Sequence, residues 1–178
     1  MPRLAGSLLL LLLAACSRPA PVPDTSSTTP PDTSYAVGLE RGPCFGACPV
    51  YALEIQGSGA GVLKATSSGR DFQRAFQVPP ARVLATVALA DSLGFFLIDT
   101  SIAQNPALCG RMATDHPSSH ITVRLGRRKH AVEYYHGCYG PAGDGEVPLP
   151  DKLVALRRIE AAIDSLGMVS QWVDSLRR

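Results

Sequence analysis

The sequence predicts a disulfide-stapled α+β domain, with an antiparallel sheet of about five strands (two hairpins plus one strand) and two helices packed on one face. Three observations point to this class. Apolar residues alternate with polar residues in five short segments, four of which form two pairs joined by glycine-containing turns. Two longer segments repeat apolar residues at helical spacing. Four cysteines downstream of residue 40 are enough for two disulfides.

The first hairpin is predicted to pair residues 50–56 with residues 62–66. Tyr51, Leu53 and Ile55 alternate with more polar neighbours, which is typical of a strand with one buried face. The glycine-rich run between the two segments reads as a turn. A phosphate site would need a helix directly after the glycines, and none follows here.

A third strand is predicted at 72–78 and the first helix at 81–93. Pro79 and Pro80 end the strand and pre-set the backbone for the first turn of the helix. Gly94 supplies the C-terminal cap of that helix. This order places a strand and a helix directly after the first hairpin.

A long loop, 99–119, separates this half from a second hairpin, which is predicted to pair 120–125 with 129–136. Long loops in compact domains are commonly functional or covalently held. The second helix is predicted at 151–166, where apolar residues form one stripe and a glycine follows the last turn. The C-terminal segment 168–176 carries the single tryptophan and is predicted to pack back on the domain.

The N-terminus is predicted to be a lipoprotein signal peptide at residues 1–15, followed by a lipidated cysteine, Cys16. The leucine run 8–13 is too short to span a bilayer, and Leu13–Cys16 resembles a bacterial lipobox. Acyl chains on Cys16 would hold the protein at the membrane. A serine at position 17 favours the outer membrane, facing the periplasm.

Residues 16–34 are rich in Pro, Ser and Thr and are predicted to form a disordered tether. At about 3.1 Å per residue, the part that follows the lipidated cysteine, residues 17–34, reaches at most about 55 Å. The remaining residues, 35–178, are predicted to form a single domain. The net charge of +2 shows no basic excess of the kind that nucleic-acid binding requires, and the cluster 127–129 is interpreted as a solvated turn.

Four cysteines remain once Cys16 is assigned to lipid, and an oxidising compartment would pair them. Three pairings are possible, and we favour Cys44–Cys48 with Cys109–Cys138, while the crossed pairings stay open. The short ring would contribute about 2 kcal/mol and the longer ring about 3.6 kcal/mol by loop entropy.

Thiol–disulfide exchange through Cys44 and Cys48 is the alternative function that the spacing leaves open. Redox enzymes usually place Cys-x-x-Cys at the start of a helix, whereas here the spacing is one residue longer and a strand follows. We therefore favour a structural pair over a catalytic one.

Metal binding and hydrolysis are weaker alternatives. Four side chains of zinc-ligand type occur without a recognisable zinc spacing: Cys109, His116, His136 and Cys138. Ser118, His116 and Asp115 lie near one another in the sequence without the strand-to-helix turn that activates a nucleophilic serine. The sequence therefore predicts no metal, no cofactor and no catalytic residue.

The segment Arg41–Tyr51, which reads RGPCFGACPVY, resembles bacterial envelope proteins grouped as domain of unknown function 6438. Further similarities are Thr114–Ser118 before a strand, Tyr134–Cys138 at the end of the next strand, and the helix Leu153–Leu166. The resemblance covers residues 36–176. It implies the domain limits and an envelope location, and it implies no activity or catalytic residue.

Together these features predict a lipid-anchored binding or structural module of the cell envelope, with a possible envelope protein as its partner. The predicted binding rim is formed by loop residues near the cysteines: Arg41, Phe45, Thr114, Asp115, His116, His136 and Tyr139.

Overall fold

The computed structural model describes residues 34–46, 48–67, 70–140 and 150–176. The predicted signal peptide, Cys16 and nearly all of the predicted tether lie outside the described residues. None of the helices in the described part of the chain is long and apolar enough to cross a bilayer.

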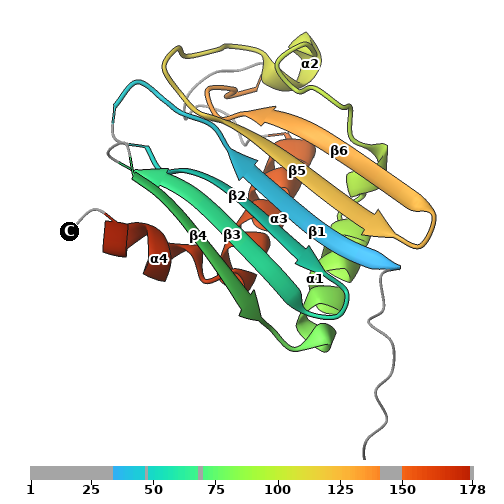
Figure 1. Ribbon diagram of the computed structural model, residues 1–178. Helices are drawn as coiled ribbons and strands as arrows, with labels where there is room; N and C mark the ends of the chain where they lie inside the picture. Colours follow the sequence, from blue (N-terminus) through green and yellow to red (C-terminus); the bar gives the residue numbers. More distant parts are fainter. Residues whose placement is uncertain (1–33, 47, 68–69, 141–149, 177–178) are drawn as a thin grey trace, which may run out of the picture.

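The described chain forms a six-stranded, entirely antiparallel sheet with the order β4-β3-β2-β1-β5-β6 (Figure 1). The strands are β1 Tyr35–Arg41, β2 Val50–Gln56, β3 Ala60–Ser67, β4 Arg70–Gln77, β5 Ser118–Leu125 and β6 Arg128–Tyr135. Both predicted hairpins are present, as β2–β3 and β5–β6. The predicted α+β class is thus confirmed.

The prediction of about five strands omitted β1, which lies at the centre of the sheet between β2 and β5. Its alternation is visible in hindsight, because Tyr35, Val37 and Leu39 are buried and the residues between them are not. A glycine at position 38 weakens the strand signal, and the segment follows the predicted tether directly.

Helices cover one face of the sheet, and the other face is open (Figure 1). The long helices are α1 Pro80–Ser92 and α3 Asp151–Leu166, as predicted, with boundaries shifted by at most one residue. Three shorter elements add to them: η1 Phe95–Leu97, α2 Pro106–Cys109 inside the long loop, and α4 Val169–Leu176 in the predicted C-terminal segment.

The core lies between the sheet and these helices. Alternate residues of β2 face it, with Tyr51 at 5% exposure and Leu53 and Ile55 fully buried. The apolar stripe of α3 is buried along its whole length. In α1, Val83, Val87 and Ala90 are buried, whereas Leu84 is 47% exposed, so not every apolar residue of this helix packs on the core.

The C-terminal helix α4 packs back on the domain, as predicted. Trp172 is half-buried against the core, and the guanidinium of Arg74 lies 3.7 Å from the centre of its ring. This cation–π contact joins α4 to the edge strand β4. Helix α4 therefore covers the β4 edge of the sheet on the face where the other helices pack.

Candidate functional site

A row of polar side chains crosses the helical face of the sheet at the end where the cysteine loops lie. Arg41 is the cross-strand neighbour of both Tyr51 and Ser119, and Ser119 is the neighbour of Tyr134. Neighbouring residues in a sheet point to the same face, so four adjacent strands present this row to helix α3.

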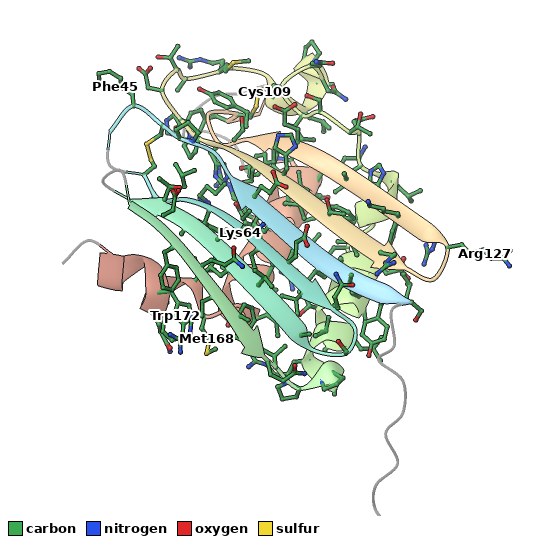
Figure 2. All side chains as sticks on the ribbon, viewed as in Figure 1. Phe45, Lys64, Cys109, Arg127, Met168 and Trp172 are labelled. Carbon is green, nitrogen blue, oxygen red and sulfur yellow. A yellow bond between two sulfur atoms is a disulfide. The ribbon has the colours of Figure 1, made fainter. Side chains whose placement is uncertain are left out.

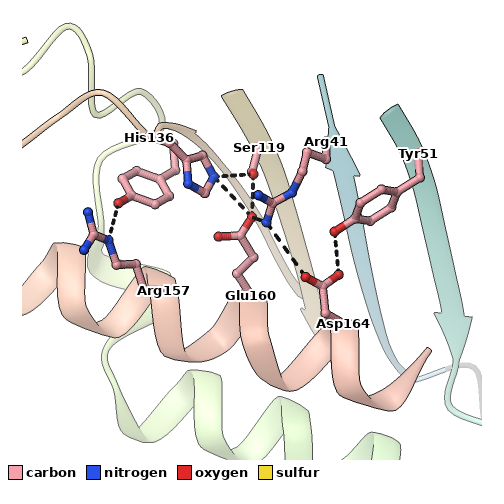
Figure 3. Close-up of polar contacts among 8 residues, drawn as sticks. Arg41, Tyr51, Ser119, His136, Arg157, Glu160 and Asp164 are labelled. Atoms are coloured by element: carbon pink, nitrogen blue, oxygen red, sulfur yellow. Dashed lines mark hydrogen bonds and ion pairs between the residues drawn. The ribbon is translucent and has the colours of Figure 1, made fainter. Parts of the chain in front are cut away.

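Helix α3 meets the row with three polar residues at positions 157, 160 and 164 (Figure 3). This spacing of three and four residues places them on one side of a helix. The Nε of Arg157 donates a hydrogen bond to the Tyr134 hydroxyl at 2.8 Å. Tyr51 donates one to Asp164 at 2.6 Å.

Glu160 is the centre of this network. The Arg41 guanidinium donates to Glu160 Oε1, and the Ser119 hydroxyl donates to the same oxygen at 2.5 Å. His136 Nε2 lies 3.3 Å from that oxygen and 2.7 Å from Ser119 Oγ. The Glu160 side chain is only 5% exposed, so each of these contacts is made in the interior.

The environment shifts the two carboxyl groups in opposite directions. Burial alone would raise the pKa of Glu160, but hydrogen bonds and attraction from His136, Ser119 and Arg41 outweigh it and hold the pKa below its ordinary value. For Asp164, burial outweighs the contacts with Tyr51 and Arg41, and its pKa is raised. Glu160 is thus the stably ionised member of the network.

The Ser119–His136–Glu160 contacts do not form a catalytic triad. In a triad the two ring nitrogens contact different partners, whereas here Nε2 faces both the hydroxyl and the carboxylate. The Ser119 hydroxyl donates its hydrogen to Glu160. Its contact with His136 therefore requires a hydrogen on Nε2, so this nitrogen has no lone pair free to act as a base. Ser119 is also fully buried. The network holds structure and does not activate a nucleophile.

Two disulfides lie directly beyond the network, and the pairing is the one favoured from the sequence. Cys44 and Cys48 are joined with their Cα atoms 5.7 Å apart, and Cys109 and Cys138 with theirs 4.5 Å apart. Both distances are ordinary for disulfides. Cys109 and Cys138 are bonded to each other and therefore cannot act as thiolate ligands of zinc. Within the described ranges, no group of three or more His, Cys, Asp or Glu side chains is placed to hold a metal ion.

Strand β2 follows the Cys44–Cys48 pair in the sequence and begins at Val50. Helix N-termini lower thiol pKa values in redox enzymes, and here a strand occupies that place. The described structure therefore contains a bonded pair without the helix that usually activates one.

The outer surface of this end carries most of the predicted rim. Phe45 is 86% exposed, and its backbone N–H donates to the carbonyl of Asp115 at 3.2 Å. The Thr114 hydroxyl donates to the Asp115 carboxylate at 3.0 Å, and Tyr139 Oη lies 3.2 Å from His116 Nε2. These contacts bring the two cysteine loops together into one surface, which we call the rim: Phe45, Thr114, Asp115, His116 and Tyr139.

The structure separates the remaining two predicted rim residues from this surface. Arg41 and His136 belong to the buried network beneath it, with side chains 20% and 17% exposed. The prediction had not included the other members of the network. Only Glu160 carried a usable signal, because a carboxylate three and four residues from buried apolar neighbours interrupts the stripe of α3.

A family model described as "Domain of unknown function (DUF6438)" matches residues 35–147. The chain belongs to the DUF6438 family. No curated protein matches the chain. The DUF6438 match covers all six strands and both disulfides but ends before α3, although the resemblance had been expected to reach residue 176. The matched region thus supplies the row on the sheet, and the helix beyond it supplies Glu160 and Asp164.

Proposed function

We propose that this DUF6438 protein is a lipid-anchored binding module of the bacterial cell envelope, whose rim contacts a protein partner. The proposal rests on one observation above all. Phe45 is the most exposed of the large apolar side chains in the described chain, and it projects from a loop that a disulfide closes (Figure 2).

This display of Phe45 suits binding for a physical reason. Large aromatic side chains are frequent anchors of protein interfaces because they bury much apolar area. A flexible loop would lose conformational entropy when it binds. The Cys44–Cys48 bond and the hydrogen bond from Phe45 to Asp115 remove much of that freedom beforehand. The loop is therefore pre-organised around its apolar tip.

The buried network supports the same reading. Gly42 donates a backbone hydrogen bond to Ser118 at 2.8 Å, and His136 donates one to Pro117 at 3.0 Å. The stems of all the rim loops thus meet beside the ion pair of Arg41 and Glu160. A rigid base of this kind keeps loop residues in place for recognition.

The rim prediction is tested by placing a photo-crosslinking phenylalanine analogue at position 45 in the producing bacterium. We expect a covalent adduct with a discrete envelope protein. With that partner purified, Phe45→Ala is expected to weaken binding roughly 30-fold, the loss of about 2 kcal/mol that defines an interface anchor.

Leu97 provides the matched control, because it is 82% exposed but lies in η1. The ring of Phe95 in that element contacts His130, near the opposite end of the strands. Leu97→Ala is expected to leave binding unchanged. Equal adducts at positions 45 and 97, or equal affinities of the two alanine variants, would refute the rim as the binding surface.

The anchor is tested by intact mass of the protein extracted from its native envelope. We expect a chain that begins at Cys16 and carries the added mass of acyl groups, and a Cys16→Ala variant that lacks this mass and leaves the membrane fraction. The two disulfides support an oxidising compartment. An unmodified Cys16 in the native protein would contradict the anchor. The rim prediction would be unaffected, because the crosslinking experiment tests it separately.

A further inference from the structure

We propose that the basic end of the β5–β6 hairpin docks on anionic lipid headgroups of the membrane that holds the proposed anchor. We call this surface the basic tip and define it by four side chains: Arg124, Arg127, Arg128 and Lys129. The inference rests on the proposed anchor only for the nearness of a membrane, and the charge arrangement is a property of the described structure.

The cations of the basic tip are poorly neutralised by the protein itself. Arg124 and Lys129 are cross-strand neighbours, and like charges placed directly opposite each other destabilise a sheet. Arg124 donates to Gln56 at 3.1 Å, a neutral partner. Neither these two residues nor Arg127 forms an ion pair with any other residue that the structure describes.

The fourth cation is held by the protein. The Arg128 guanidinium lies 3.1 Å from Asp91 and 4.4 Å from the centre of the Phe96 ring. This contact holds Arg128 against helix α1, whereas Arg127 and Lys129 are exposed and Arg124 lies half-buried beside Lys129. An anionic surface would relieve their mutual repulsion, whereas a neutral surface would not.

Arg124 and Lys129 also border a shallow depression of about 250 Å³ on the open face of the sheet. Gly38 and Ala36 contribute to its lining, so the space beside the two cations is not filled by large side chains. Glu54 lies on the other side of it. A headgroup phosphate can therefore approach the guanidinium from the open face without displacing protein atoms.

The N-terminal chain leaves the domain at the same place. The backbone N–H of Gly126, in the hairpin turn, donates to the carbonyl of Ser34 at 2.6 Å, and Tyr35 pairs with Leu125. The segment that leads to Cys16 thus starts beside the basic tip (Figure 1). Electrostatic contact next to a lipid anchor is the usual way in which two weak membrane signals reinforce each other.

This arrangement orients the molecule. Figure 2 shows Phe45 and Arg127 at opposite ends of the strands. With the basic tip on the membrane, the rim faces away from it toward a partner. A tether alone would allow any orientation within its reach, so the basic tip supplies what the tether cannot.

The test measures partition of the mature chain, beginning at residue 16 and carrying Cys16→Ala, onto vesicles of phosphatidylglycerol mixed with phosphatidylethanolamine. Because each cation near an anionic surface contributes about fivefold, Arg127→Gln/Lys129→Gln is expected to reduce partition roughly 25-fold. Added salt is expected to weaken the binding, and phosphatidylcholine vesicles are expected to bind neither form.

Lys64→Gln/Arg158→Gln is the matched control, because it removes two exposed positive charges elsewhere. It is expected to bind anionic vesicles like the parent chain. No partition of the parent chain, or an equal loss in both double variants, would overturn the proposal. Since the chain used cannot be acylated at position 16, this result is independent of whether the native protein carries lipid.

Discussion

Replacing Glu160 by alanine is expected to lower the free energy of unfolding by about 3–5 kcal/mol, the cost of stranding one partner of a buried ion pair. The variant leaves the Arg41 guanidinium, whose side chain is only 20% exposed, without its main counter-charge. Asp164 lies 3.8 Å from Arg41 but is already bound by Tyr51, so it replaces Glu160 poorly. Urea unfolding of the disulfide-intact protein at neutral pH measures the loss.

Two comparisons decide whether the ion pair is the cause. Glu54 is an exposed strand carboxylate, and Glu54→Ala is expected to change stability by no more than about 0.5 kcal/mol. The double variant Arg41→Ala/Glu160→Ala is expected to lose clearly less than the sum of its single variants, because no charge is left stranded. Simple additivity in this cycle would mean that Glu160 acts through Ser119, His136 or packing rather than through Arg41.

Because of Glu160, the free energy of unfolding is expected to depend on pH in the acid range. Since the pKa of Glu160 is lowered in the folded protein, its contribution is fully present above its ordinary pKa of about 4.5 and is lost as pH falls below it. The raised pKa of Asp164 acts with the opposite sign and favours the folded state as that group takes up a proton. The stability difference between the parent chain and Glu160→Gln should therefore shrink as the pH falls below about 4.5.

The elements that could be predicted from the sequence are those whose signals are local. The alternation in 50–56 and the helical stripe in 151–166 report directly which face is buried, and both match the structure. The position of β1 could not be read in this way. Its partner β5 lies about 80 residues downstream, and no local pattern states that the two are neighbours.

The candidate site likewise combines residues of a local sequence motif with residues that only long-range contacts bring together. Phe45 and the cysteines lie in a short motif that is visible in the sequence. Arg41 was predicted as a rim residue, and the structure places its side chain in the buried network. This contact with Glu160 could not be predicted, because it joins residues 119 positions apart. A buried carboxylate in an apolar stripe indicates that a cation or hydrogen-bond donor lies next to it. Which residue supplies that partner depends on the order of the strands.

The largest covalent contribution is expected from the Cys109–Cys138 disulfide. Replacing both cysteines by alanine should lower the free energy of unfolding by about 3.6 kcal/mol, since the bond closes a ring with 29 residues of separation. The bond joins two short backbone segments, in which Ala113 donates to Gly137 at 2.9 Å and Gly140 donates to Cys109 at 2.9 Å. Two further backbone bonds join the same segments, from Arg111 to Gly140 at 3.1 Å and from Tyr139 to Arg111 at 3.2 Å. Without the disulfide, the ribbon of residues 109–113 and 137–140 would depend on such hydrogen bonds.

That ribbon has little tolerance for rearrangement. A Cβ at Gly137 would lie 2.3 Å from the carbonyl oxygen of Ala113, so the two segments already touch. We therefore expect the loss to be local: amide exchange should accelerate in residues 109–117 and 137–140, while the central strands β1 and β2 keep their protection.

The Cys44–Cys48 bond is the internal comparison, because its separation of four residues closes a much smaller ring. Cys44→Ala/Cys48→Ala should cost about 2 kcal/mol by the same entropy argument and should leave the exchange of residues 137–140 unchanged. If the short ring proved as stabilising as the long one, chain entropy would not explain these bonds. The stability gained from the Cys44–Cys48 bond would then come from contacts that the Phe45 loop makes in the folded state.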